Sequence, residues 1–445
     1  MSDGRSAALL ALLRVDYDNG YSNLVLNQVL EKANLNKQDA SLASMIFYGV
    51  LENRTRLDYV ISCFVRQPIR KLSPDVLEIL RMGVYQILYL DKVPISAAVN
   101  ESVKLVKMRK KVRLSGFVNG VLRSIGRGVD QISEPDEQKD PALFLSVRYS
   151  CPVWLITLWE KAYGKQITGE LLSSLSGRPL LFARVNTIKN SKEELLKKLE
   201  EEGVRAMPYE ILPDAVELFE SGSIGSLRAF QEGRFHIEDA SSQILCQLLC
   251  VKPGQTVYDI CSAPGGKAFT LAETMKNQGK IFAFDLYEAR VRLIQEGAKR
   301  LGLSIIEAKV RDALEQNDGL GKADRVLCDV PCSGLGIIRR KPEIRYKDRM
   351  GLDSLPDLQY RILCNSQRFT KQGGILMYST CTLNPAENGE IADRFLAEHS
   401  GYEAMELVLP NTVKRTIKEP SNQLTLMPQT NGTDGFFMAA FRRLR

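Results

Sequence analysis

Apolar side chains recur every three or four positions along the first 130 residues, the spacing of a helix with one buried face. The clearest runs occupy residues 8–13, 24–30, 40–51 and 76–88. The Ser-Pro-Asp sequence at residues 73–75 places a capping residue before a proline, which favours a helix start. The pattern therefore predicts an all-helical domain over residues 1–130.

The helical pattern is interrupted by an acidic, proline-containing stretch at residues 131–141, which is typical of a linker between domains. Residues 142–238 then mix two kinds of pattern. Helical spacing occurs at residues 153–162 and 192–202, and short apolar strands are indicated at residues 180–185 and 216–219. The mixture predicts a small α+β module.

From residue 239 to residue 445, short apolar runs alternate with helical runs. The predicted strands are residues 256–260, 281–285, 305–310, 325–330, 375–379 and 436–441. Strict alternation of this kind indicates an α/β, Rossmann-like domain with a mainly parallel sheet and helices on both faces. The last strand has no helix after it, so we expect it to be an antiparallel addition.

A glycine turn follows the first strand of this domain, in the sequence Cys-Ser-Ala-Pro-Gly-Gly-Lys at residues 261–267. A helical pattern begins directly after it. Glycines let a backbone approach a nucleotide-like ligand at a helix N-terminus, because no Cβ blocks the approach. Twenty residues after Gly265, the next strand ends in Asp285, where a carboxylate can bind ribose hydroxyls. We therefore predict a nucleotide-like cofactor at these strand ends.

Composition restricts the class of protein. Hydrophobic residues make up 44% of the 445 residues and charged residues 25%, values ordinary for a soluble globular chain. No apolar run approaches the roughly 18 residues of a membrane span, and no export signal is evident. The nine cysteines form no Cys-x-x-Cys pair, so we expect neither zinc nor a disulfide framework. The sequence predicts a cytoplasmic protein without metal, acting as a monomer.

Positive charge is concentrated in one segment rather than spread along the chain. The net charge is only +7, but residues 104–127 contain eight Lys or Arg residues and no acid. Two interpretations remain open. The segment is either a patch that contacts phosphates or an ordinary solvated helix face.

Two cysteines stand in polar loops at predicted strand ends. Cys332 lies in the sequence Asp-Val-Pro-Cys-Ser-Gly at residues 329–334, and Cys381 lies in Ser-Thr-Cys-Thr at residues 379–382. Because strand-end loops of a parallel sheet meet at one edge, we expect both thiols to face the crevice of the glycine turn. Only two histidines occur and neither is in these loops, which makes a Ser-His-Asp or Cys-His hydrolase improbable.

The residues that remain are a cofactor site, a thiol and the carboxylate of Asp329, and methylation of cytosine at carbon 5 requires this set. A thiolate that adds at carbon 6 makes carbon 5 nucleophilic, and a carboxylic acid near ring nitrogen 3 supports the addition. A free thiol is only about 3% ionised at neutral pH. We therefore expect the site to lower the thiol pKa, with Lys267 and a helix N-terminus as contributors.

Four motifs occur between residues 239 and 445: the Pro-Gly-Gly-Lys turn, the Pro-Cys loop, the Thr-Cys-Thr loop and the terminal Asp-Gly-Phe-Phe at residues 434–437. With these motifs, the region resembles the NOL/NOP/Sun RNA (cytosine-5) methyltransferases. The N-terminal helices, with Gly-Phe-Val-Asn-Gly-Val-Leu-Arg at residues 116–123, resemble the RNA-binding domain of the antitermination factor NusB. The combination implies small-subunit (16S) ribosomal RNA, or the assembling subunit, as the partner.

The resemblance also implies roles for residues of this chain. Cys381 is implied as the attacking nucleophile and Cys332 as the thiol that assists product release. S-adenosylmethionine is implied as the cofactor. The residues implied to bind it are Cys261, Ser262, Ala263, Pro264, Gly265, Gly266, Lys267, Asp285, Asp312 and Asp329.

Three alternatives stay open. The chain could be an RNA-binding or antitermination-type factor without catalysis, a cytosine-5 methyltransferase of another RNA, or a DNA methyltransferase in which the Pro-Cys thiol is the nucleophile. The basic loop at residues 339–347 follows Cys332 directly, and we expect it to contact substrate, with Tyr346 available to stack on a base.

Overall fold

The chain forms two units in a computed structural model that describes residues 3–18, 20–128, 131–219, 221–316, 319–347 and 349–444. The first, called the helical unit below, contains Met1–Gly177 and the inserted segment Ile338–Lys347. The second, called the sheet unit, contains Arg178–Ile337 and Asp348–Arg445. The residues on both sides of Ile338–Lys347 belong to the sheet unit, whereas the segment itself belongs to the helical unit.

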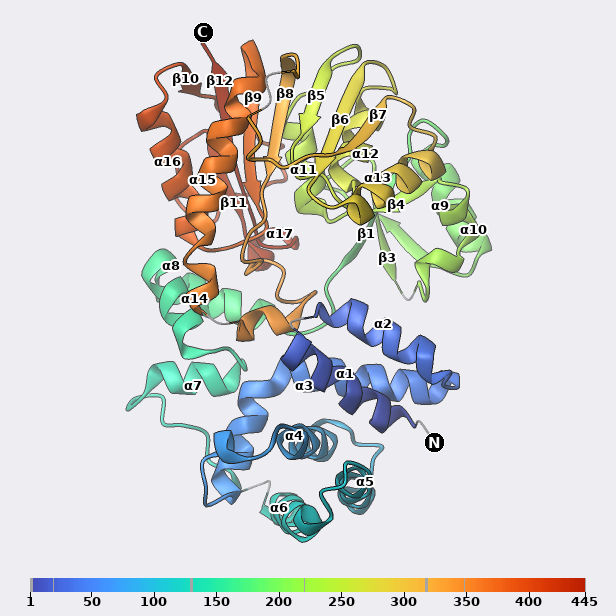
Figure 1. Ribbon diagram of the computed structural model, residues 1–445, viewed down its shortest axis with the longest axis vertical. Helices are drawn as coiled ribbons and strands as arrows, with labels where there is room; N and C mark the ends of the chain where they lie inside the picture. The colour runs from blue at the N-terminus through green and yellow to red at the C-terminus, as the bar shows by residue number, and fades with distance from the viewer. Residues whose placement is uncertain are drawn as a thin grey trace. The chain divides into compact units, whose positions relative to one another are not determined.

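The helical unit confirms the all-helical prediction for the N-terminal region (Figure 1). Its first six helices are α1 (Gly4–Asp18), α2 (Ser22–Ala33), α3 (Lys37–Phe64), α4 (Pro74–Tyr89), α5 (Ile95–Met108) and α6 (Ser115–Gly128). The apolar positions that repeat at helical spacing, among them Leu12, Ile46 and Leu80, are fully buried in one core. Pro74 occupies the first turn of α4, as the Ser-Pro-Asp start predicts.

Two further helices of the helical unit, α7 (Pro141–Arg148) and α8 (Val153–Ser174), follow the acidic stretch. Neither they nor any other helix in the described residues is individually long and apolar enough to cross a membrane; α7 and α8 pass that test only as a pair, bent by 111°. The domain boundaries drawn from the sequence, with a linker at residues 131–141, remain a prediction, and residue 130 lies outside the described residues.

The inserted segment packs inside the helical unit through Arg345, which is 2% exposed. One guanidinium nitrogen donates to the carbonyl oxygens of Glu52 at 3.1 Å and Ser150 at 2.9 Å. The ring of Tyr346 lies 5.3 Å from the Arg54 guanidinium, and its hydroxyl contacts Ser150. The structure thus corrects the expectation of a loop free to stack on a base, because these two side chains are engaged within the protein.

The sheet unit begins with a small antiparallel sheet of order β2-β3-β1-β4. Its strands are β1 (Leu181–Val185), β2 (Arg205–Pro208), β3 (Ala215–Phe219) and β4 (Phe235–Ile237), with α9 (Lys192–Glu201) between the first two. Strands β1 and β3 were predicted. Strands β2 and β4 were not, because they have only four and three residues and β2 is largely exposed.

The larger sheet has the order β10-β12-β9-β8-β5-β6-β7, with β11 paired to β12. Its strands are β5 (Thr256–Asp259), β6 (Lys280–Asp285), β7 (Ile306–Val310), β8 (Ala323–Asp329), β9 (Thr370–Thr380), β10 (Tyr402–Ala404), β11 (Gln423–Leu426) and β12 (Phe436–Arg443). The pairs among β5 to β9 are parallel and β12 is antiparallel to β9. All six predicted strands and the antiparallel addition are confirmed.

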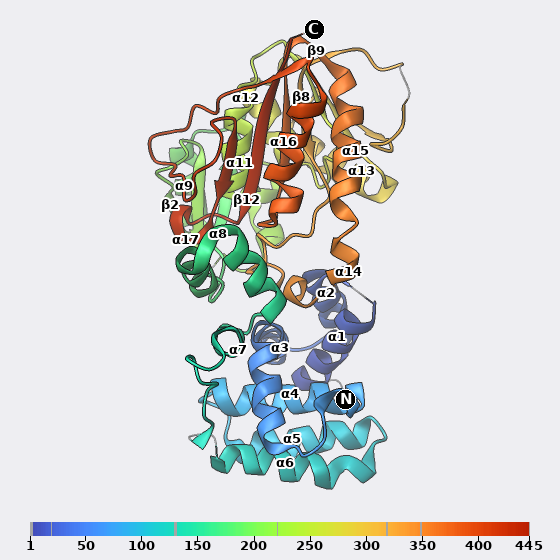
Figure 2. The same cartoon turned by 90° about the vertical axis from the view of Figure 1, so that its left-hand side faces the viewer.

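Helices cover both faces of the large sheet, which separates two apolar cores (Figure 2). Along β5, Val257 belongs to one core and Tyr258 to the other, as the alternation of side chains in a strand requires. The first core is closed by α11 (Ala240–Leu248), α12 (Gly266–Thr274) and α13 (Glu288–Leu301). The second is closed by α15 (Leu355–Ser366) and α16 (Gly389–Glu398). The α/β prediction is therefore confirmed.

Candidate active site

The side chains of Lys267 and Asp329 meet at the carboxyl ends of the central parallel strands. Lys267 lies in the first turn of α12, and Asp329 is the last residue of β8. The Lys267 Nζ atom is 2.7 Å from Oδ2 of Asp329, while Oδ1 of Asp329 accepts a hydrogen bond from Ser379 Oγ at 2.8 Å. Burial acts to lower the pKa of Lys267, but the charges of Asp329 and Glu238 outweigh it and raise that pKa.

The two loop cysteines are brought together beside this ion pair. Cys332 follows β8 and Cys381 follows β9, and these strands are parallel neighbours in the sheet. Their Sγ atoms are 3.2 Å apart. Both residues are of intermediate exposure. Two thiols from neighbouring strand ends therefore lie side by side.

Glycines allow the strand-end loops to approach closely. The Gly336 N–H donates to the Cys381 carbonyl oxygen at 3.0 Å, and the Gly435 N–H donates to the Gly336 carbonyl oxygen at 2.9 Å. A Cβ at Gly336 would lie 1.9 Å from the Gly435 carbonyl oxygen. No larger residue fits at position 336, so the thiol loops are fixed by backbone contact with the Asp-Gly-Phe-Phe segment.

The glycine turn at residues 261–267 has the geometry expected of a cofactor loop. Gly265 has a φ angle of +109° and precedes α12, and a Cβ there would lie 2.4 Å from the Phe269 ring. The Ser262 N–H donates to the Phe284 carbonyl oxygen at 2.7 Å, which ties the turn to β6. Cys261 and Ala263 are partly buried and Pro264 is exposed, so the turn faces the edge of the sheet.

The two further predicted cofactor carboxylates differ in their surroundings. Asp285 ends β6, is 5% exposed, and accepts a hydrogen bond from the Tyr287 N–H at 3.3 Å. Asp312 follows the edge strand β7, is exposed, and accepts a hydrogen bond from the Leu314 N–H at 2.9 Å. Asp285 is therefore the more enclosed of the two carboxylates, while Asp312 caps its own turn.

A fourth carboxylate, Asp259, was missed by the sequence analysis. It is the last residue of β5 and is completely buried, and neither of its oxygens has a hydrogen-bond partner in the part of the chain that the structure describes. Burial raises the pKa of Asp259 to about 7. An orphaned carboxylate beside a glycine cradle fits a cofactor that carries an amino group and ribose hydroxyls. Its position directly before the turn was the available signal.

The pKa of Cys332, the thiol implied to assist product release, is shifted upward. The hydrogen bond with Cys381 and, next, burial raise the pKa of Cys332 well above its usual value. The charge of Lys267, which was expected to help ionise a thiol, is instead directed at Asp329. Cys332 is therefore held as a protonated thiol in this arrangement.

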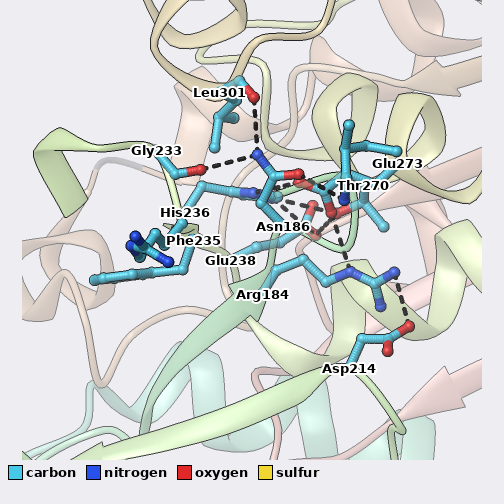
Figure 3. Close-up of polar contacts among 12 residues, drawn as sticks. Arg184, Asn186, Asp214, Gly233, Phe235, His236, Glu238, Thr270, Glu273 and Leu301 are labelled. Carbon is cyan, nitrogen blue, oxygen red and sulfur yellow. Dashed lines mark hydrogen bonds and ion pairs between the residues drawn. The ribbon is translucent and has the colours of Figure 1, made fainter. Parts of the chain in front are cut away.

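A buried polar cluster joins the small sheet to α12, the helix that carries the cofactor turn (Figure 3). His236 on β4 lies between two carboxylates, with Nδ1 3.5 Å from Glu273 Oε1 and Nε2 3.7 Å from Glu238 Oε2. Arg184 on β1 reaches Glu273 Oε2 at 3.3 Å, and the Thr270 hydroxyl donates to Glu238. The cluster holds α12 through Thr270 and Glu273, and no local sequence pattern predicted it.

Comparisons with known proteins agree with this architecture. Residues 246–442 match the family described as 16S rRNA methyltransferase RsmB/F, residues 2–127 match the NusB family, and residues 151–225 match the ferredoxin-like domain of RsmF/B-like methyltransferases.

Similar full-length proteins are also known. A probable ribosomal RNA small subunit methyltransferase B from Bacillus subtilis (strain 168) is 37% identical, covering 99% of this chain and 98% of that protein. The ribosomal RNA small subunit methyltransferase B of Escherichia coli O1:K1 / APEC is 32% identical, covering 90% of each. The crystal structure of PH0851 superposes with a TM-score of 0.84 and 28% identity, covering 99% of this chain and 98% of that one.

The fold, the glycine turn and these matches define an S-adenosylmethionine-dependent methyltransferase. More specifically, the chain belongs to the 16S rRNA methyltransferase RsmB/F family. The NusB-like and thiol-loop motifs indicate a resemblance to the bacterial methyltransferase RsmB, also called Sun, and these matches confirm it.

Proposed function

We propose that the protein methylates carbon 5 of one cytosine in 16S ribosomal RNA through a covalent bond between Cys381 and carbon 6 of the base. One observation carries the proposal. The thiols of Cys332 and Cys381 lie 3.2 Å apart at neighbouring strand ends, beside the Lys267–Asp329 ion pair. When bound, S-adenosylmethionine supplies an electrophilic methyl group on sulfur.

In the first step, the Cys381 thiolate attacks carbon 6, and the ring electrons move to carbon 5, which then takes the methyl group. Asp329 is suited to accept a hydrogen bond from ring nitrogen 3 once that nitrogen carries a proton, because its carboxylate is held in place by Lys267 Nζ on Oδ2 and Ser379 Oγ on Oδ1. A carboxylate fixed by two partners loses little further freedom when it binds the base. A target base stacked in RNA must first be turned out of its helix, at a cost of a few kcal/mol.

In the second step, the Cys381 sulfur leaves carbon 6 as it takes the Cys332 proton, and the Cys332 thiolate so formed accepts the proton of carbon 5, which restores the double bond. Cys332 is placed to assist, since it is held protonated at 3.2 Å from the leaving sulfur. If the chain used its thiols as a DNA methyltransferase does, Cys332 in the Pro-Cys loop would be the nucleophile instead of Cys381. The assignment of Cys381 as the nucleophile rests on the resemblance of its Thr-Cys-Thr loop to that of the NOL/NOP/Sun methyltransferases.

The helical unit is proposed to hold the RNA. Exposed basic side chains of α5, α6 and the turn between them, including Lys107, Lys110, Arg113 and Arg123, form a patch on that unit. Lys104 and Arg109 are already paired, with Glu101 and Asp75. We also propose that the protein is a cytoplasmic monomer with the domain boundaries drawn from the sequence.

Bisulfite sequencing of 16S ribosomal RNA tests the proposal. In a strain that lacks the gene, one cytosine that resists conversion in the parent should convert, and wild-type protein but not Cys381→Ala should restore resistance. An identical conversion pattern in both strains would contradict a cytosine-5 activity on this RNA. The non-catalytic alternative predicts in addition that calorimetry detects no binding of S-adenosylmethionine.

A further inference from the structure

A completely buried carboxylate, Glu387, lies in the loop between β9 and α16, six residues after Cys381. Its Oε2 atom accepts hydrogen bonds from the Ser333 N–H and from Gln359 Nε2, both at 2.8 Å. Its Oε1 atom accepts a hydrogen bond from Asn384 Nδ2 at 2.9 Å. Within the described residues no basic side chain pairs with it, so three neutral donors hold this carboxylate.

These bonds hold the backbone on both sides of Cys332. Ser333, the next residue, donates its N–H to Glu387, and the Gln359 Nε2 that binds Glu387 also donates to the carbonyl oxygen of Pro331 at 2.9 Å. The two loops are joined a second time where the hydroxyls of Ser333 and Thr382 lie 2.6 Å apart. The position of Cys332 therefore depends on a side chain from the loop that carries Cys381.

We propose that Glu387 is a positioning residue for methyl transfer, which ties the Cys332 loop to the Cys381 loop and thereby fixes the distance between the two thiols. This inference rests on the proposed function, because it assigns Glu387 a part in the steps that the two cysteines carry out. Glu387 touches neither the base nor the methyl group in this account and acts through Cys332.

The charge of Glu387 adds an electrostatic effect to the geometric one. The groups that face Cys332 are the Cys381 thiol, the Tyr378 hydroxyl and the carboxyls of Glu387 and Asp329. The hydrogen bond with Cys381 and burial raise the pKa of Cys332 most, and the negative charge of Glu387 raises it further. The negative charge of Glu387 thus favours a protonated Cys332.

Two substitutions separate charge from geometry. Glu387→Gln keeps the shape and an acceptor for Ser333 but removes the charge, whereas Glu387→Ala removes all three bonds. Glu390→Gln, an exposed glutamate in the first turn of α16, is the matched control. Alkylation of Cys332 by iodoacetamide, followed by peptide mass spectrometry across neutral and alkaline pH, needs neither RNA nor cofactor. We expect Glu387→Gln to shift the Cys332 profile to lower pH, with several-fold faster labelling near neutrality, and Glu390→Gln to match wild type.

Turnover gives the second readout. We expect Glu387→Ala to lower kcat on RNA several-fold without changing calorimetric affinity for S-adenosylmethionine, and to accumulate a protein–RNA adduct as Cys332→Ala does. If Cys332 of Glu387→Gln is alkylated with the same pH profile as in wild type, the electrostatic role is overturned. If a folded Glu387→Ala has the same kcat as wild type, the positioning role is overturned. If the alanine variant fails to fold, kcat and adduct release in Glu387→Gln decide instead. Failure of the proposed function can be told apart from failure of this inference, because Cys332→Ala itself would then form no adduct.

Discussion

The buried His236 should make the stability of the sheet unit depend on pH in the alkaline range. Burial acts to lower the pKa of His236, but Glu273 and Glu238 outweigh it and raise the pKa to about 9, against 6.5 for a free side chain. Because the folded-state pKa is the higher one, the stabilisation is complete below pH 6.5 and is lost as the pH rises through 9. A shift of that size corresponds to about 3 kcal/mol.

The assay is urea unfolding of the full chain at a series of pH values, followed by a signal from the sheet unit. His236→Gln should be less stable than wild type near pH 6, because two buried carboxylates lose the cation between them. The difference in free energy of unfolding between wild type and His236→Gln should shrink by about 3 kcal/mol as the pH rises from below 6.5 to above 9. Tyrosine, lysine and cysteine groups titrate in both proteins, so their contributions cancel in the difference.

His399→Gln is the matched control, since His399 is the other histidine of the chain and is partly exposed on α16's C-terminal end. Its pH profile should run parallel to that of wild type. A stability difference between His236→Gln and wild type that stays constant from neutral to alkaline pH would refute the assignment of a protonated His236 between the two carboxylates.

Three further predictions follow from the site and the helical unit. Asp285→Ala should weaken S-adenosylmethionine binding by about 1.5–3 kcal/mol, the value of hydrogen bonds to a charged group, and unchanged calorimetric affinity in a folded variant would remove Asp285 from the site. Neutralising four of the eight basic residues in 104–127 should flatten the salt dependence of RNA binding by roughly 0.7–0.9 per lost contact; an unchanged slope would favour a merely solvated face. Lys267→Met and Asp329→Asn, combined in a double-mutant cycle of urea unfolding, should show a coupling of about 1–3 kcal/mol, and additive effects would mean that the 2.7 Å contact contributes nothing.

The parallel core of the sheet was predictable because its inner strands are buried on both faces and therefore read as short apolar runs. Val257, Ile281 and Leu327 lie in one core while their neighbours along each strand lie in the other. Strand β10 escaped prediction because it has three residues, two of them exposed. Strand β11 (Gln423–Leu426) alternates polar and apolar residues that are all buried against β12, which only the tertiary structure shows.

The strand-end residues of the site were predictable because topology brings the carboxyl ends of parallel strands to one edge. The partners of those residues were not. Glu387 follows Pro385 in a short turn, and nothing local to it signals that it bonds to Ser333 from an earlier loop. Arg345 stands in a basic stretch that looks solvated, yet it is buried because two distant carbonyl oxygens accept its hydrogen bonds.

The central claim is that Cys381 and Cys332 act at opposite ends of the reaction, and a denaturing gel with labelled 16S ribosomal RNA and S-adenosylmethionine tests it most directly. Cys381→Ala should form no adduct and transfer no methyl group. Cys332→Ala should still attack and methylate but release slowly, and so accumulate a protein–RNA band that survives denaturation. The double variant should behave as Cys381→Ala does, because the two residues act in sequence. A band trapped by Cys381→Ala and absent from Cys332→Ala would contradict the account and assign the nucleophile to the Pro-Cys loop.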